Sequence, residues 1–202
     1  MTALETDLAT AHLDALDGTL VALRRESGRL LRWGGLLADR LGAGGRLLAA
    51  GNGGSAAEAQ HLTAELVGRF SADRRPFSAI ALHADTSSLT AIGNDYGYLE
   101  VFARQVRAHA RPGDVVILLS FSGQSRNLLL AADAAAETGA TSLAMTGPAP
   151  NPLAAVVDDA LCLPGRCSSV QEAHLVAVHL LCAAFEAALE VAALEAAPVA
   201  PR

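Results

Sequence analysis

The sequence predicts an α/β protein, a three-layer doubly wound parallel sheet of about five strands with helices before it and one long helix after it. Short apolar runs without polar alternation, typical of strands buried on both faces, are separated by stretches with helical spacing. Two of these runs end in turns rich in Gly and Ser, where ligands of such sheets bind. The length of 202 residues suits one domain, residues 1–202.

The elements follow in a simple order. Leucines recur at helical spacing over about 5–42, and Ser27-Gly28 is the expected break between two N-terminal helices. The sheet core follows over about 45–165, with helices expected at about 55–68 and 125–138 and a C-terminal helix at about 169–193. Its strand candidates are the apolar runs at 46–50, 78–82, 114–119, 141–145 and 160–163.

Composition excludes several classes of protein. The fifteen basic residues are all Arg, so a Schiff-base lysine and a Lys-dependent phosphate loop are both excluded. A net charge of -6 without a basic cluster argues against nucleic acid as a partner. The chain has no run of about 18 uninterrupted apolar residues, and its start is acidic, so we expect no membrane span and a cytoplasmic location.

The first Gly-rich loop follows the run at 46–50 and opens a helix. Its sequence is Gly51-Asn52-Gly53-Gly54-Ser55. Such a loop lets backbone N–H groups approach an anion at the positive end of the helix dipole. The alternative is a tight turn that needs glycine only for steric reasons.

The second loop repeats the pattern after the run at 114–119. Ser120, Ser122 and Ser125 offer three hydroxyls within six residues at a helix start. Ser125 alone could be an N-cap, but three serines exceed what a cap needs, which favours a phosphate or polyol ligand. Neither loop spells the dinucleotide-binding fingerprint.

Two helices carry side chains suited to acid/base or metal chemistry. His61 and Glu65 are four residues apart and share a helix face, where they can bind a divalent metal or act as an acid and a base. Gln171 and His179 lie on one row of the C-terminal helix, although His179 can equally be a buried core histidine. Eight residues span about 12 Å of helix, so this spacing permits a shared site without requiring one.

Asn94-Asp95 follows a glycine, which is typical of an ordinary turn. The alternative is that the pair forms a polar wall for a hydroxyl-rich ligand.

Together these motifs resemble the sugar isomerase (SIS) domain of phosphoheptose isomerases. The match is collinear over roughly residues 20 to 190 and rests on five segments. They are Gly51-Asn-Gly-Gly-Ser55, His61-Leu-Thr-Ala-Glu65-Leu-Val-Gly-Arg-Phe70, Gly93-Asn-Asp-Tyr-Gly97, Ser120-Phe-Ser-Gly123 and Gln171-Glu-Ala-His-Leu-Val-Ala-Val-His179.

The resemblance implies an aldose–ketose isomerase that converts sedoheptulose 7-phosphate to D-glycero-D-manno-heptose 7-phosphate. It also implies a homotetramer with active sites at subunit interfaces and one zinc ion per subunit. Glu65 and His179 fall on the family's acid/base pair. The implied metal ligands are His61, Glu65, Gln171 and His179. The implied substrate-binding residues are Asn52, Gly53, Gly54, Glu65, Asn94, Asp95, Ser120, Ser122, Ser125 and Gln171.

The sequence departs from the family pattern at two places. Phe121 stands where the family usually has Thr in the second loop, and Ser168-Ser169 stand where family members carry an acid before the Gln. The alternatives are an isomerase of another sugar phosphate, a sugar-phosphate sensor, or a non-catalytic SIS protein that binds a protein partner. A relative of that last kind lacks the catalytic Glu and the second His, so the presence of Glu65 and His179 favours an enzyme.

Overall fold

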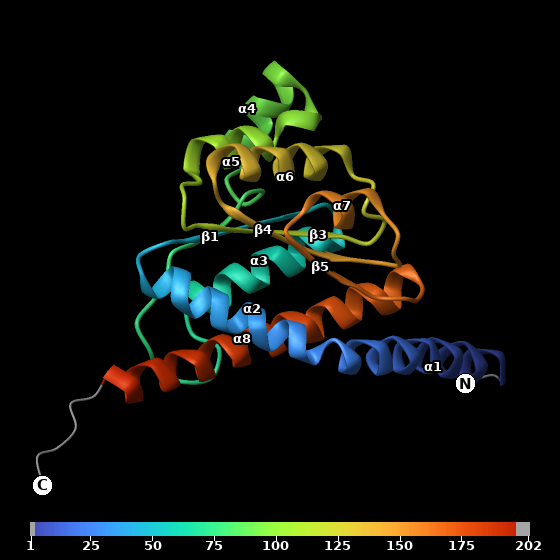
Figure 1. The fold of residues 1–202 in the computed structure, drawn as a ribbon. Coiled ribbons are helices and arrows are strands. Elements are labelled where there is room, and N and C mark those ends of the chain that lie inside the picture. Colours follow the sequence, from blue (N-terminus) through green and yellow to red (C-terminus); the bar gives the residue numbers. More distant parts are fainter. Residues whose placement is uncertain (1–2, 197–202) are drawn as a thin grey trace, which may run out of the picture.

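The computed structural model describes residues 3–196 and contains a five-stranded parallel sheet in the order β2-β1-β3-β4-β5 (Figure 1). The fold class predicted from the sequence is confirmed, and each expected strand is present within two residues of its expected bounds. The strands are β1 (Leu47–Gly51), β2 (Ala79–Ala81), β3 (Val115–Ser120), β4 (Thr141–Thr146) and β5 (Asp159–Cys162).

Both faces of the sheet are buried, which explains the lack of polar alternation in the strands. In β1, Leu47 and Ala49 face one hydrophobic cluster, and Leu48 and Ala50 face the other. Because side chains alternate between the faces of a strand, a strand covered on both faces must be apolar throughout. All four of these side chains are fully buried.

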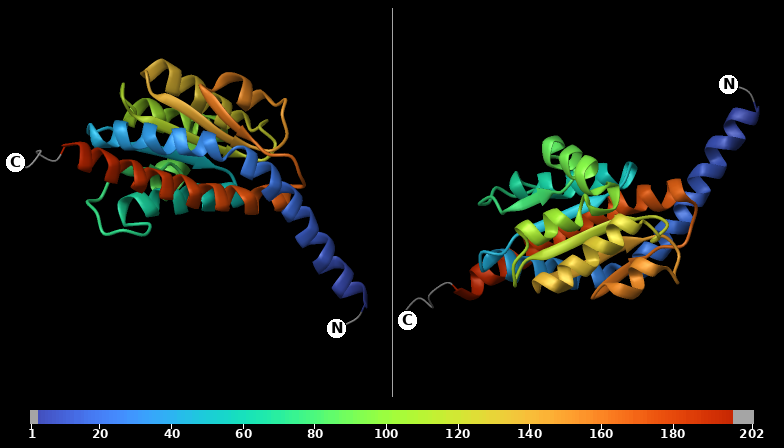
Figure 2. Two further views of the ribbon diagram at one scale, coloured as in Figure 1. Left: turned by 60° about the horizontal axis from the view of Figure 1, so that its bottom comes forward. Right: turned by 90° about the horizontal axis from the view of Figure 1, so that it is seen from above.

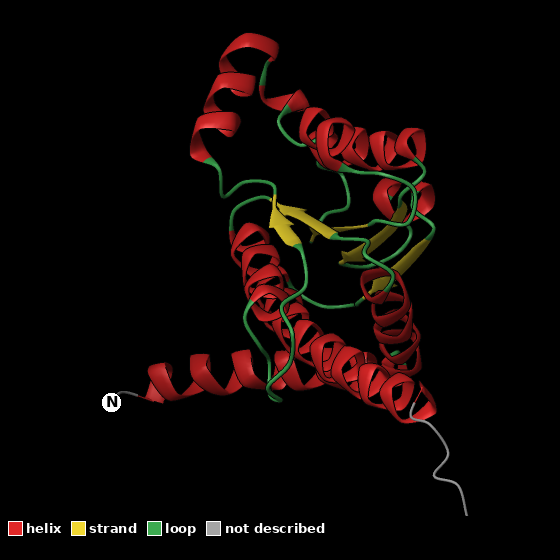
Figure 3. Cartoon of the chain, turned by 90° about the vertical axis from the view of Figure 1, so that its left-hand side faces the viewer, coloured by secondary structure: helices red, strands yellow, loops and turns green. Residues whose placement is uncertain are grey.

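Helices cover both faces of the sheet (Figures 1 and 3). One face packs against α2 (Ser27–Gly42), α3 (Gly54–Val67) and the long α8 (Cys167–Ala196). The other packs against α5 (Ala103–His109), α6 (Arg126–Thr138) and the short α7 (Pro152–Val156). The result is the three-layer arrangement expected for a doubly wound sheet.

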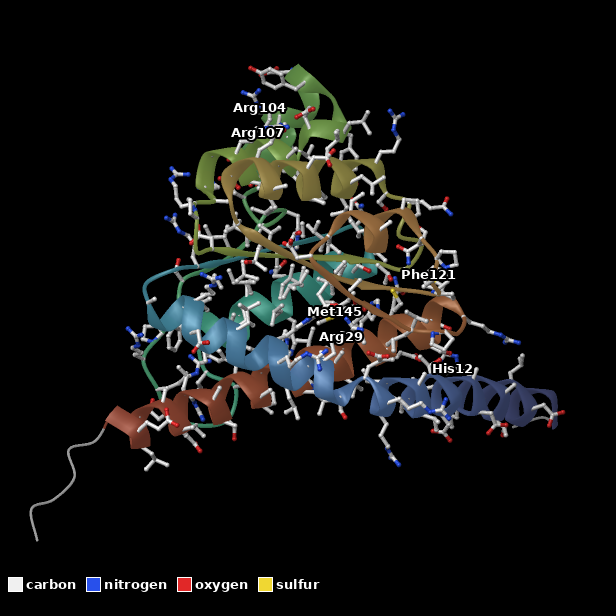
Figure 4. All side chains as sticks on the ribbon, viewed as in Figure 1. His12, Arg29, Arg104, Arg107, Phe121 and Met145 are labelled. Atoms are coloured by element: carbon white, nitrogen blue, oxygen red, sulfur yellow. The ribbon has the colours of Figure 1, made fainter. Side chains whose placement is uncertain are left out.

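The N-terminal helix α1 (Ala3–Arg25) lies against α8 and then extends beyond the body of the molecule (Figure 2). His12 Nε2 lies 2.8 Å from Glu172 Oε1, which joins α1 to the start of α8. Arg29 and the Trp33 indole both donate to Asp159 and so join α2 to β5; His12 and Arg29 are labelled in Figure 4.

Helix α2 lies very close to α8 at Gly34. A Cβ atom there would lie 2.5 Å from Ala184 Cβ and 2.8 Å from the Phe185 nitrogen, whereas one at Gly35 would meet nothing within 4 Å. We expect Gly34→Ala to lower the free energy of unfolding by about 1–3 kcal/mol through overpacking. The matched change Gly35→Ala should raise it by about 0.5–1 kcal/mol, because alanine is the better helix former. Urea denaturation measures both, and equal stability of the two variants would contradict this tight approach.

The segment between β2 and β3 differs from the sequence expectation. Asn94 and Asp95, predicted to lie in a turn, occupy the last turn of helix α4 (Thr86–Tyr96), which is followed by a 3₁₀ turn (Tyr98–Glu100) and α5. No residue of α4 is fully buried, and its apolar periodicity is limited to Leu89 and Ile92, which pack against the core. Asp85 starts α4 by accepting from the Ser87 and Ser88 N–H groups, and Arg104 stacks on Tyr96 at its end (Figure 4).

Helix α8 is long and apolar enough to cross a membrane by length and composition, with a mean hydropathy of 1.9. A core helix of a globular protein has the same properties, and α8 packs against α1, α2 and α3. Its fully buried side chains include Val170, Ala173, Ala177 and Leu181. Only 39% of the apolar window of α8 is buried in the described structure, so packing in the core accounts for part of its apolar composition.

The strand order places the two Gly- and Ser-rich loops side by side. From β1 the chain passes through α3 to β2 on one side, whereas β3 lies on the other side of β1. The order of the strands therefore reverses between β1 and β3, and the crevice at such a switch point is the usual ligand site. The loops at 51–55 and 120–125 both follow strands at this switch.

Candidate active site

The first loop approaches α3 so closely that side chains are excluded from it. A Cβ on Gly51 would overlap the Ser55 carbonyl, and one on Gly54 would lie 3.0 Å from the Gln171 amide nitrogen. Gly53 adopts a φ of 56° at the start of α3, a conformation that glycine tolerates best. The glycines therefore satisfy the steric explanation, and they also leave the N-terminus of α3 open beside Gln171.

Asn52 is held by a network that the sequence did not reveal. Its amide exchanges hydrogen bonds of 3.0 and 2.9 Å with the buried Asn127 on α6. The Tyr98 hydroxyl donates to Asn52 Oδ1 at 3.1 Å. The one available signal was the position of Asn127, a polar residue in the first turn of a helix that opens with a Ser-rich loop.

The serine loop forms a pocket of about 160 Å³ at the carboxyl end of β3. Ser120 Oγ accepts from the Gly123 N–H at 3.2 Å, and Ser122 Oγ accepts from the Gln124 N–H at 3.2 Å. Within the described chain, Ser125 is the N-cap residue of α6 by position, but its side chain makes no capping hydrogen bond. The pocket is lined by Asn52, Ser55, Leu119, Ser120, Phe121, Ser122, Ser125 and Gln171.

Phe121 lies at the end of β3 and contributes its ring to this pocket (Figure 4). The ring also packs on Gly147, where a Cβ atom would lie 2.8 Å from it, and against the core cluster on the α8 side of the sheet. An apolar wall therefore replaces the hydroxyl that the family usually has at this position.

His61, Glu65 and His179 converge between α3 and α8. His61 Nε2 lies 2.9 Å from His179 Nε2 and 3.3 Å from Glu65 Oε1. One ligand atom from each of the three residues lies within 4.8 Å of the others. Two ligands at about 2.0–2.1 Å from one tetrahedral ion are about 3.3 Å apart, so these donors suit a single divalent metal.

Gln171 lies elsewhere on α8. It lines the serine-loop pocket and contacts Gly54, whereas His61 and His179 line the next pocket along α3 and α8, of about 330 Å³, together with Glu58 and Leu175. The structure thus joins Gln171 to the serine loop and His179 to His61 and Glu65. Asn94 and Asp95 are exposed on α4 and hydrogen-bond to each other at 2.8 Å.

A buried pair, Glu58 and His174, lies beside this site. His174 Nε2 lies 3.2 Å from the Thr146 carbonyl oxygen, which can only accept, so Nε2 carries the proton. His174 Nδ1 faces Glu58 Oε2 at 3.9 Å, and among the described residues neither atom has a hydrogen-bond partner. Burial raises the pKa of Glu58 to about 7 and lowers that of His174 to about 4.

This raised pKa predicts a pH-dependent effect of Glu58→Gln. The folded protein keeps the Glu58 proton up to about pH 7, whereas the unfolded chain releases it near 4.5. The cost of the buried charge is therefore absent below the unfolded pKa, grows between these values and is complete above pH 7. We expect Glu58→Gln to stabilise the metal-free protein by roughly 1–3 kcal/mol more at pH 8 than at pH 4.5. Urea denaturation at both pH values measures this difference, and an equal effect at the two would contradict it.

Comparison with known proteins agrees with this architecture. The family model described as "SIS domain" matches residues 13–147. A phosphoheptose isomerase of Streptomyces coelicolor is 66% identical over 180 residues, which cover 89% of this chain and 78% of the relative.

Solved structures agree as well. A phosphoheptose isomerase from Neisseria gonorrhoeae superimposes with a TM-score of 0.82 at 36% identity, covering 92% of this chain and 100% of that one. One from Francisella tularensis gives a TM-score of 0.82 at 31% identity, with 93% and 100% covered. Two adjacent loops at the strand switch, a His–Glu–His cluster and these likenesses lead to one conclusion: the chain belongs to the SIS-domain family and, within it, to the phosphoheptose isomerases.

Proposed function

We propose that this protein interconverts sedoheptulose 7-phosphate and D-glycero-D-manno-heptose 7-phosphate. The observation that carries the proposal is the convergence of His61, Glu65 and His179, of which the two histidines line the pocket next to the serine-loop pocket. The 66% identity to a phosphoheptose isomerase supports the choice of substrate. Incubation of the purified protein with sedoheptulose 7-phosphate and product identification by NMR tests it, and an unchanged substrate spectrum would refute it.

The serine loop is the proposed phosphate site. The N-terminus of α6 supplies partial positive charge, and Ser120, Ser122 and Ser125 supply hydroxyls around the pocket. Asn52 and Gln171 line the same pocket, Gly54 lies beside Gln171, and these residues together with Gly53 are proposed to bind the sugar hydroxyls. In this proposal the phosphate binds at the serine loop, and the carbons that react lie toward His61 and His179 in the neighbouring pocket.

Glu65 and His179 are the proposed acid/base pair. The isomerisation moves a proton between two neighbouring carbons through an enediol, so one group must remove a carbon-bound proton while another protonates the adjacent carbon or oxygen. Glu65 is assigned to the carbon-bound proton and His179 to the partner step, with the roles exchanged in the reverse direction. Both residues border His61 at hydrogen-bonding or ion-pair distances, so they face one small volume.

A divalent metal, proposed to be one zinc per subunit, fits the donor set of this site. His61, Glu65 and His179 are the ligands whose positions support it, and Gln171 stays a predicted fourth ligand that faces the neighbouring pocket. When bound, zinc would polarise the carbonyl oxygen as a Lewis acid. A carboxylate bound to zinc is a weaker base, so metal binding and proton removal compete for Glu65.

We expect about one zinc per subunit in the purified protein, and His61→Ala to lose it. Two imidazole nitrogens and a carboxylate oxygen within 4.8 Å are a mixed donor set of the kind that zinc binds. Elemental analysis measures the content, and circular dichroism checks that the variant is folded. His109→Ala, on α5 away from the cluster, is the control and should keep the metal. Absence of metal from the wild-type protein, or full retention by His61→Ala, would contradict the assignment.

The active site is proposed to be completed in a homotetramer. Asn94 and Asp95 lie on α4, which has no buried residue and projects from the body of the molecule (Figures 1 and 3). Leu175, Val176 and Leu180 on α8 are about two-fifths exposed. Apolar side chains grouped on one helix are typical of a surface that a partner covers. A second copy could therefore bring its α4 to this site; sedimentation equilibrium measures the assembly.

The remaining assignments are a single domain and a cytoplasmic location. Two core clusters share one sheet, which supports the single domain.

A further inference from the structure

The segment between α3 and β2 is tied to α8 by a buried ion pair, Arg74 and Glu186. Their side chains are 10% and 9% exposed. The Glu186 carboxylate accepts from Arg74 Nε at 3.0 Å and from the N–H groups of Phe70, Ser71 and Ala72 at 3.1–3.2 Å. Burial acts to raise the pKa of Glu186, but these hydrogen bonds outweigh it and lower that pKa. The carboxylate is therefore charged, and each of its oxygens accepts two hydrogen bonds.

Arg74 in turn closes the end of α3. Its Nη2 donates to the Glu65 carbonyl at 2.7 Å, and its Nη1 donates to the Leu66 carbonyl at 3.1 Å. The last carbonyls of a helix have no partner within the helix, so this guanidinium takes the place of the missing N–H groups. Only the planar fork of arginine reaches these carbonyls and Glu186 together.

The aromatic side chains around Arg74 fix its guanidinium further. Its central carbon lies 5.5 Å from the centre of the Phe77 ring and 5.4 Å from that of Phe185, and the two rings pack edge to face. Such cation–π contacts strengthen where water is excluded. Arg74 therefore has one position, set by packing as well as by hydrogen bonds.

The hydrogen bonds of Arg74 and those of Glu186 each lead to one member of the proposed acid/base pair. Arg74 holds the backbone of Glu65 itself. Glu186 holds the backbone of Phe70, whose ring lies 5.6 Å from the His179 ring, centre to centre. No other charged pair among the described residues has hydrogen bonds of this kind to both sides of the site.

We propose that Arg74 and Glu186 are positioning residues that set where the Glu65 carboxylate and the His179 imidazole lie relative to each other. The proposal rests on the function proposed above, because the reaction it concerns is that isomerisation. Proton transfer depends steeply on geometry, and a displacement of about 1 Å can cost about 10²-fold in rate. The serine loop lies between β3 and α6, and among the described residues it makes no hydrogen bond or ion pair with Arg74 or Glu186, so phosphate binding should not depend on this pair.

The test compares Glu186→Gln with Glu190→Gln, one turn further along α8, where the side chain is exposed. Gln keeps the shape of Glu186, but one of its accepting oxygens becomes an NH₂ group. That group would face the backbone N–H groups or the Arg74 guanidinium, which are themselves donors. We expect its kcat to fall about tenfold or more while KM for sedoheptulose 7-phosphate stays within about twofold. Glu190→Gln should match the wild type in both. Arg74→Lys should behave like Glu186→Gln, and Arg75→Lys, at an exposed neighbour, like the wild type.

A second measurement does not need activity. The His179 ring proton signal, identified by its loss in His179→Ala, is shifted by the nearby Phe70 ring, so Phe70→Leu and Glu186→Gln should both move it. If the wild-type protein lacks isomerase activity but Glu186→Gln still moves the His179 signal, the proposed function fails and the positioning by Arg74 and Glu186 stands. If Glu186→Gln and Arg74→Lys only lower the melting temperature, with kcat and the His179 signal as in the wild type, the pair is a structural brace and the inference is overturned. Should one of Glu186→Gln and Arg74→Lys fail to fold, the other decides both the kinetic and the spectroscopic measurement.

Discussion

Replacing Glu65 with Gln or His179 with Ala is expected to lower kcat for sedoheptulose 7-phosphate by about 10²-fold or more. Each change removes one of the two groups proposed to move the proton between neighbouring carbons. Gln has the size of Glu but cannot accept a proton, so Glu65→Gln separates chemistry from packing. Steady-state kinetics with NMR detection of the product measure the effect.

The controls for this prediction are Glu137→Gln and His109→Ala. Glu137 pairs with Arg107 on the surface of α6, and His109 ends α5, so neither touches the His61 cluster. Both controls should keep wild-type turnover. If either catalytic variant retains near wild-type kcat, that residue is not part of the acid/base pair, whatever its metal affinity.

The fold could be predicted from local sequence signals because its sheet is buried on both faces. A buried parallel strand must be apolar at every position, as β3 is from Val115 to Leu119. The junctions that follow β1, β3, β4 and β5 contain Gly or Ser, whereas the one between β2 and α4 contains neither. The helix α4 was not predicted, since it has no fully buried residue and only a short apolar face, with Leu89 and Ile92 packed against the core. Its start at Asp85 is a capping signal that occurs equally in turns.

The candidate site also has a part that could be predicted from the sequence and a part that could not. His61 and Glu65 are four residues apart on one helix, so their shared face follows from helix geometry alone. The contact of His61 with His179 crosses 118 positions and depends on how α3 packs on α8. Gln171, eight residues before His179 on α8, lines the serine-loop pocket, whereas His179 lines the neighbouring pocket with His61.

The supporting residues were beyond the reach of sequence spacing. Asn127, Arg74 and Glu186 belong to no motif, because each acts through a partner far away in the sequence or through backbone groups. Arg74 and Glu186 are 112 positions apart, and they hold backbone groups of α3 and of the segment after it. Asn127 meets Asn52 across 75 positions, and this contact exists only because β1 and β3 are neighbours. Such contacts become visible only when the strand order is known.

Ser125→Ala is expected to weaken binding of sedoheptulose 7-phosphate about tenfold or more while leaving the melting temperature unchanged. A neutral hydroxyl that donates to a charged phosphate oxygen is worth about 1.5–3 kcal/mol, and the loss appears in the dissociation constant measured by calorimetry. Helix stability should not change, because the described structure gives Ser125 no side-chain capping bond, and its Oγ lies 3.4 Å from Ser120 Oγ beside the pocket. Ser88→Ala on α4 is the matched control, since its hydroxyl bonds to Asp85 and lies outside the pocket lining. The two explanations of the serine loop separate here: a lower melting temperature with unchanged affinity would make Ser125 a helix cap, and the phosphate would then bind elsewhere.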